Sequence, residues 1–381
     1  MGQRLQRTGT MDLPLHGGAA PQWLVQRMKK LGKAISDVIV DQYGQKELLL
    51  RLSNPDWFQA LSCVLAFDWH SSGTTTVLCG VLKEVLDAQE HGVAAVGGKG
   101  IRSRQAVQEI PEVGEALSLH PSKVEALVRA SRLSAKVDTA LLQDGFSLYH
   151  HTMFISEGGH WAVVQQGMRP ESRTARRYHW LSWGFETFVE EPHSGIACDE
   201  RMERVLNLTS SASRGCREKS LDLALQGPGQ LQDDLAKVRL GPQKTLMEYV
   251  GHVATARSAL PCKIDWEAMK RVYDFSPKNY EDFILVRGIG PSTVRALALI
   301  SDLIYGQSPD WKDPVKYSYC LGGKDGVPYP VDRASYDESI EVLTNAIKEA
   351  KLGSNEKMDA LRRLNRLIPP EVRRGELTWL R

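Results

Sequence analysis

A short polar loop, residues 67–73, carries side chains that could perform acid–base or metal-assisted chemistry. It places Asp68 and His70 two residues apart, followed by two serines, where two helical segments break. A carboxylate and an imidazole in one loop can act as general base and general acid, or can ligate a metal ion. Asp68 and His70 are therefore candidate catalytic residues, and the identity of any metal is left open.

Two adjacent histidines, His150 and His151, lie in a run that alternates like a β-strand. Neighbouring strand residues point to opposite faces, so the two imidazoles cannot bind one ion without a bulge. A second strand after the turn at 157–159 would bring Gln165 near His151 and Gln166 near His150. His151 is a further catalytic candidate, and a hydrogen-bonded core histidine is the alternative.

Two glycines separated by one isoleucine mark a tight turn between two helical segments, within the string LVRGIGPSTVR. Glycines allow the backbone to approach a ligand closely, and the amides at the start of the next helix can bind a phosphate. A simple packing corner between two helices is the alternative interpretation. The residues expected to contact phosphates are Gly288, Gly290, Ser292 and Thr293.

This stretch resembles the helix-hairpin-helix motif of DNA repair and recombination proteins, which binds the DNA backbone without reading sequence. Downstream, VPYPVDR is similar to a string of the helix-hairpin-helix DNA glycosylases, in which an aspartate stabilises the cationic sugar as the base leaves. Asp332 matches that aspartate. The interval from the turn is longer than usual for that superfamily, and Ser292 stands where bifunctional members carry a lysine. A helix-capping carboxylate is the alternative role of Asp332.

An arginine-rich and aromatic segment, residues 169–183, is a candidate for a second nucleic-acid surface. Arg173, Arg176 and Arg177 precede a run of tyrosine, histidine and tryptophan. Guanidinium groups pair with phosphates, and aromatic rings stack on unpaired bases. A solvated loop that returns to a buried aromatic strand would have the same composition and is the alternative.

The loop VGGKG invites comparison with nucleotide-binding loops. Lys99 falls one position too late for a P-loop, and Gly100 replaces the hydroxyl residue that would hold magnesium. We therefore expect no nucleotide cofactor, although Lys99 and Arg102 could contact phosphates. The only cofactor that the candidate residues suggest is a divalent metal.

Periodicity predicts the elements that must position these residues. Helical spacing occurs over 21–44, after Pro55, over 75–89 and over 121–140, whereas strands are expected at 93–96, 146–155 and 161–166. The predicted fold class is α+β and mainly helical. The expected divisions are an N-terminal tail (1–20), a mixed α/β domain with a buried β-hairpin (21–220), a linker (221–243), a helical domain with the helix-hairpin-helix (244–353) and an Arg-rich helical tail (354–381).

The composition excludes several classes of protein. The 381 residues contain 48 Lys plus Arg and 46 Asp plus Glu, and the formal charge of +2 excludes a histone-like polycation. The six cysteines form no Cys-x-x-Cys pair, which argues against a zinc ribbon or a disulfide framework. No apolar run is long enough for a membrane span, so we expect a cytoplasmic protein.

Several long strings of the sequence point to one family. LPLHGGAAPQWL, WFQALSCVLAFDWHSSG, VGGKGIRSR and QDGFSLYHHTMFISEGGHWAVVQQGM, with ARRYHWLS beyond them, lie between about Leu13 and Arg333. In these strings the chain resembles an uncharacterised intracellular family of archaea and thermophilic bacteria, domain of unknown function number 763. The resemblance implies little about chemistry, so the glycine turn at 288–290 is the feature that predicts a function.

The sequence predicts a DNA-binding protein of DNA repair or processing, and a structure-specific nuclease if the protein is an enzyme. The expected partner is DNA, preferably a duplex with a distorted or single-stranded region. One alternative is a helix-hairpin-helix glycosylase that uses Asp332 and an extruded base. Another is a non-enzymatic adaptor that binds DNA or RNA.

Overall fold

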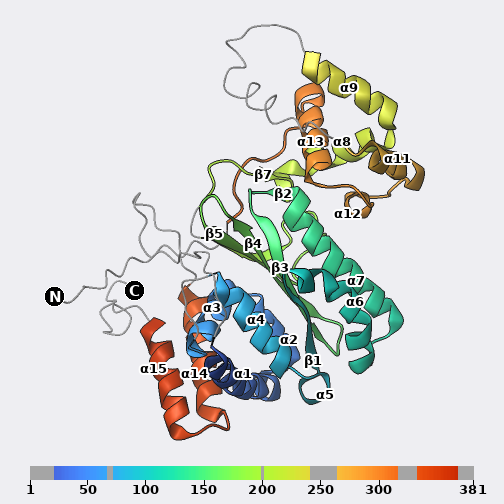
Figure 1. The fold of residues 1–381 in the computed structure, drawn as a ribbon. Coiled ribbons are helices and arrows are strands. Elements are labelled where there is room, and N and C mark those ends of the chain that lie inside the picture. Colours follow the sequence, from blue (N-terminus) through green and yellow to red (C-terminus); the bar gives the residue numbers. More distant parts are fainter. Residues whose placement is uncertain (1–20, 67–71, 199–200, 241–263, 316–332, 368–381) are drawn as a thin grey trace, which may run out of the picture.

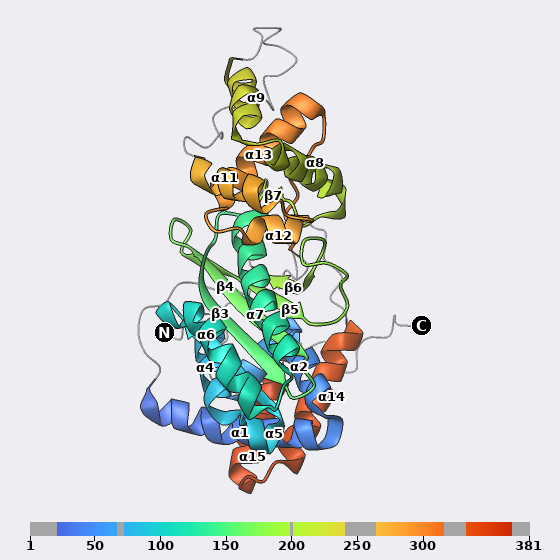
Figure 2. The same ribbon diagram turned by 90° about the vertical axis from the view of Figure 1, so that its right-hand side faces the viewer.

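The computed structural model describes residues 21–66, 72–198, 201–240, 264–315 and 333–367. Within these ranges, an antiparallel sheet lies at the centre, helices cover both of its faces, and a further group of helices lies beyond one end (Figures 1 and 2). The expectation of a mixed, mainly helical fold with a β-sheet is confirmed. Among the described helices, none is long and apolar enough to cross a membrane.

The central sheet has the strand order β1-β3-β4-β5-β6. Ile155 pairs with Trp161 and Met153 with Val163 across the turn that joins β3 to β4. Both faces of these strands are apolar and buried, as expected for a sheet covered on two sides. The strands are β1 (Val93–Lys99), β3 (Ser147–Ser156), β4 (Trp161–Arg169), β5 (Thr174–Leu181) and β6 (His193–Ala197), and a separate pair consists of β2 (Leu142–Gln143) and β7 (Leu206–Asn207).

One face of the sheet packs against helices α6 (Ile101–Ala116) and α7 (Pro121–Lys136). The sheet contributes Met153, Val163 and Trp180 to this core. Helix α7 passes directly into a π-helical turn, Val137–Leu141, which leads to the end of the sheet where β2 begins. The hydrophobic core on this face therefore continues from the middle of the sheet into the helices beyond its end.

The opposite face of the sheet packs against helices from both ends of the described chain. Phe154 and Val164 of the sheet share a core with Leu343 and Leu364, which come from the last two helices. The sequence groups residues 333–353 with the helices of the glycine turn, whereas Val342, Leu343 and Ile347 pack on the N-terminal helices instead. The helices of this layer are α1 (Gln22–Tyr43), α2 (Gln45–Leu52), α3 (Pro55–Val64), α4 (Gly73–Val85), α14 (Arg333–Glu349) and α15 (Ser354–Leu367), and the short α5 (Ala88–His91) leads from α4 into β1.

The helices beyond the end of the sheet include the stretch predicted as a linker at 221–243. That stretch is helical as far as Leu240, and its Leu223 and Leu231 are buried in the same core as Leu297. The Gly-Pro step at 227–228 separates two packed helices, because Gly227 has a φ of 95° and a proline suits the first turn of a helix. The helices of this end group are α8 (Arg214–Leu225), α9 (Pro228–Leu240), α11 (Trp266–Phe275), α12 (Tyr280–Leu285) and α13 (Pro291–Tyr305), preceded by a 3-10 turn, Ser211–Ser213.

Candidate functional site

The glycine turn joins α12 to α13 in the end group. The amide of Ile289 donates to the carbonyl of Val286 at 3.1 Å, and the Ile289 side chain is buried. Gly288 has a φ of 96°, in the left-handed region, and a Cβ there would lie 2.7 Å from Oδ2 of Asp265 and 2.8 Å from Cβ of Ala268. Only glycine can adopt this φ without strain and also leave room for the side chains of Asp265 and Ala268.

Gly290 differs from Gly288 in both respects. Its backbone is extended, with φ of −137° and ψ of −178°, and a Cβ at this position would meet no atom within 4 Å. The fold therefore does not require glycine at position 290. Gly290 instead leaves open space in front of the first turn of α13.

The first turn of α13 is exposed to solvent. Pro291 and Ser292 are exposed, and no described side chain caps the helix. The amides of a helix N-terminus carry a partial positive charge and can bind an anion. Thr293, in contrast, is only 3 % exposed, so its side chain lies in the core and does not reach a phosphate. This corrects the role expected for the Thr293 side chain.

Three cationic side chains from separate elements support the turn. Lys136 at the end of α7 donates to the carbonyl of Ile289, and Arg271 of α11 donates to the carbonyl of Arg287 at 3.1 Å. Arg295 of α13 donates to Oε1 of Gln143 at 2.7 Å. The side-chain amide of Gln143 (Nε2) in turn donates to the backbone carbonyl of Pro291 at 2.9 Å. These cations hold the turn and give its surroundings positive charge.

The acidic groups near the turn pair with neighbouring arginines. Arg129 contacts Asp282 at 2.8 Å and Glu281 at 3.3 Å, and Arg271 lies 3.7 Å from Asp265. Arg287, next to Gly288, is exposed. Sequence reasoning missed the contribution of Lys136, because nothing in the sequence connects the end of α7 with a turn so far along the chain.

The arginine-rich segment does not form a second surface. It is strand β5, and Arg176 and Arg177 are both 0 % exposed. Nη2 of Arg176 lies 2.7 Å from Asp313, and the Arg177 guanidinium lies 4.7 Å from the centre of the Phe58 ring. The prediction that these two arginines bind nucleic acid is wrong, because both sides of β5 are covered. Arg173 alone is exposed, in the turn before the strand.

The candidate catalytic residues are not gathered into one described site. Asp68, His70 and Asp332 lie outside the described residues. His151 is 3 % exposed, with Nε2 2.9 Å from the Ser131 hydroxyl and Nδ1 2.9 Å from Oε1 of Gln165. Burial lowers its pKa below the ordinary value, although the bond to Gln165 opposes this. His151 thus takes the alternative role, a hydrogen-bonded core histidine.

Residues 97–99, expected in a loop, form the end of β1 and pair with β3, and Gly100 leads into α6. Lys99 and Arg102 are both exposed, on either side of Gly100, which has a φ of 63°. They lie on a different element from the glycine turn. No described hydrogen bond connects them with the turn.

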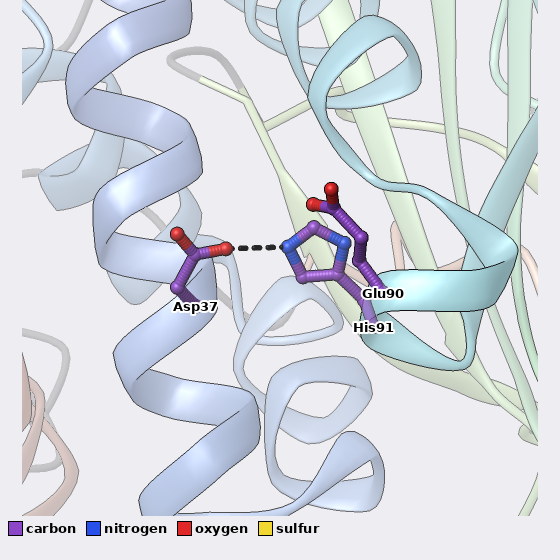
Figure 3. Close-up of side chains that lie close together, drawn as sticks. All are labelled: Asp37, Glu90 and His91. Atoms are coloured by element: carbon purple, nitrogen blue, oxygen red, sulfur yellow. Dashed lines mark hydrogen bonds and ion pairs between the residues drawn. The ribbon is translucent and has the colours of Figure 1, made fainter.

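One group of side chains has the composition of a metal site. Ligand atoms of Asp37, Glu90 and His91 lie within 4.8 Å of one another (Figure 3). The Lys33 ammonium, however, already pairs with Asp37 at 3.1 Å and with Glu90. Nδ1 of His91 accepts from the Asp87 amide at 3.0 Å, which leaves the ring proton on Nε2, 2.8 Å from Asp37. These ion pairs account for the group without a metal.

One family model matches most of the chain. The sequence model of a family described as "Protein of unknown function (DUF763)" matches residues 9–331. No curated protein matches the chain. No solved structure matches it either.

Proposed function

The chain belongs to the DUF763 family, and we propose that it binds the phosphodiester backbone of DNA through the turn between α12 and α13. The observation that carries the proposal is the exposed first turn of α13, which follows an open glycine and stands among Lys136, Arg271 and Arg295. Amides at a helix start and nearby cations are the groups that bind phosphate without reading bases. Because the turn resembles the helix-hairpin-helix of DNA repair and recombination proteins, the role that we propose is in DNA repair or processing.

We propose binding rather than a particular catalytic reaction. Of the catalytic candidates, only His151 lies within the described residues, and it is enclosed in the core. A nuclease that uses Asp68 and His70, a glycosylase that uses Asp332 and a non-catalytic adaptor all share the same binding turn. They differ in product: a metal-dependent nuclease loses cleavage in EDTA, a glycosylase leaves an abasic site without metal, and an adaptor yields no product.

A charge placed in the turn tests the binding. Ser292 is exposed in the first turn of α13, where a glutamate suits the helix dipole but repels a phosphate. We expect Ser292→Glu to weaken the binding of a fluorescein-labelled duplex by roughly tenfold or more, measured by anisotropy at low salt. Equal affinity of the variant and the parent protein would exclude this site.

The chain offers a matched control at its other end. Ser354 is also an exposed serine in the first turn of a helix, α15, which lies far from α13 in both views (Figures 1 and 2). Ser354→Glu adds the same charge, and we expect it to leave the affinity unchanged. A matched RNA duplex in the same assay distinguishes the nucleic acids: equal or tighter binding of RNA favours the RNA-binding alternative.

A further inference from the structure

An aromatic side chain lies exposed beside the turn. Phe275 is the last residue of α11 and is 64 % exposed. Arg271, one helical turn earlier, donates to the carbonyl of Arg287 in the glycine turn. Residues four apart share one side of a helix. Phe275 therefore lies on the side of α11 that borders the turn, about 6 Å further along the helix axis.

Packing of the helix does not account for Phe275. The buried face of α11 consists of Ala268, Met269 and Val272. Tyr273, the other exposed aromatic residue of this helix, lies on a different flank, where its ring atoms are 3.4 Å from a Cβ placed on Gly227. Tyr273 thus lies against the junction between α8 and α9, whereas Phe275 is exposed at the C-terminal end of the helix.

The charges around Phe275 suit a nucleic acid. Arg271 precedes the ring by one helical turn and Lys278 follows just after the helix ends, whereas the acid Asp274 lies directly before the ring; all three are exposed, so the cations outnumber the acid. On the outer side of α11, Glu267 pairs with Lys270 at 2.8 Å. An aromatic ring between two cations is the arrangement that holds a single strand, because the ring stacks on a base while the cations pair with the flanking phosphates.

We propose that Phe275 stacks on an unpaired base of a single-stranded segment that adjoins the duplex held by the turn. The inference rests on the proposed DNA binding and specifies its ligand, a junction between duplex and single strand. An intact duplex keeps its bases stacked inside and offers none to the ring. The protein should therefore bind a tailed duplex more tightly than a blunt one.

The test compares a blunt duplex with the same duplex carrying a single-stranded tail, by anisotropy with the full chain. We expect Phe275→Ala to remove the preference for the tailed duplex, a loss of roughly tenfold, while affinity for the blunt duplex is unchanged. Phe275→Trp should retain the preference. A 2-aminopurine base next to the junction should lose fluorescence on binding to the parent protein or to Phe275→Trp, but not on binding to Phe275→Ala.

Tyr273→Ala is the matched control, because it removes an exposed aromatic ring from the other flank of the same helix. It should leave the preference for the tail intact. A preference that survives in Phe275→Ala, or is absent from the parent protein, overturns the inference while DNA binding by the turn stands. A change of oligomeric state in Phe275→Ala without a change in preference assigns the ring to a protein contact instead. Absence of binding to every DNA overturns the inference together with the proposed function.

Discussion

Arg176 of β5 and Asp313 form an ion pair that is completely enclosed by protein, with Nη2 and Oδ2 2.7 Å apart. Asp313 follows α13, so the pair ties the sheet to the chain that leaves the end group. The same guanidinium lies 3.1 Å from Asp144, which also accepts from the hydroxyl of Tyr178 at 2.7 Å. Burial disfavours the charge of Arg176, yet the neighbouring carboxylates raise its pKa above the ordinary value.

Removal of one partner from this pair should destabilise the fold strongly. In Asp313→Ala the buried guanidinium loses a carboxylate, and we expect the free energy of unfolding to fall by about 3–5 kcal/mol. Urea denaturation followed by circular dichroism measures the change. Glu267→Gln, which breaks the exposed pair with Lys270, is the control and should leave the urea midpoint unchanged. Equal urea midpoints for both variants would mean that the buried pair contributes nothing to the free energy of unfolding.

The two glycines of the turn should separate stability from binding. Gly288→Ala imposes a side chain on a left-handed backbone and on Asp265 and Ala268, so we expect a loss of about 1–3 kcal/mol in unfolding free energy. Gly290→Ala meets no neighbour and should change stability by less than about 0.5 kcal/mol. Because its methyl group projects into the space before α13, Gly290→Ala should nevertheless weaken duplex binding. Parent-like affinity in Gly290→Ala would argue against close approach of a phosphate there.

The buried histidines should make the fold sensitive to acid. Burial, with His151 and Lys99 nearby, lowers the pKa of His150 from 6.5 to about 3. Between pH 6.5 and about pH 3, His150 therefore binds a proton in the unfolded chain but stays neutral in the folded chain. The unfolding free energy should fall as the pH drops from 6.5 towards 3, by up to about 1.4 kcal/mol per pH unit for this residue.

A histidine variant isolates this contribution. His150→Gln lacks the titrating group, so the stability difference between the parent protein and the variant should shrink between pH 7 and pH 5 in urea titrations. His120→Asn, at the exposed N-terminus of α7, retains a side chain that can cap the helix and serves as the control. Parallel pH profiles for His150→Gln and the parent protein would contradict a buried, neutral His150.

Local patterns predicted several of the elements but not which elements pack together. The alternation of residues 146–166 predicted the strands that the structure shows as β3 and β4, and the glycines at 288 and 290 predicted a break between two helices. The arginines of β5 were misread, because a basic, aromatic string has the same composition on a surface and in a covered strand. Their burial depends on Asp144 and Asp313, which are remote in sequence and supply the compensating charge.

The surroundings of the turn depend on contacts that no local pattern encodes. Arg295 lies inside the motif itself, but Lys136 and Arg271 reach the turn only because α7 and α11 pack against it. The helices found as far as Leu240 in the stretch predicted as a linker, 221–243, have a related cause. Glycine and proline lower local helix propensity, yet the buried Leu223 and Leu231 stabilise α8 and α9 through packing on α13.

Arg287 provides the most direct measure of phosphate contact by the turn. Its side chain is exposed next to Gly288, while its carbonyl is already held by Arg271. Each phosphate neutralised by a cation contributes about 0.9 to the slope of log affinity against log salt concentration on duplex DNA. Arg287→Gln should therefore weaken binding and lower that slope by roughly one, whereas Arg362→Gln, an exposed arginine of α15, should alter neither. A slope that is the same in Arg287→Gln and the parent protein would place the DNA backbone away from this turn, even if the affinity falls.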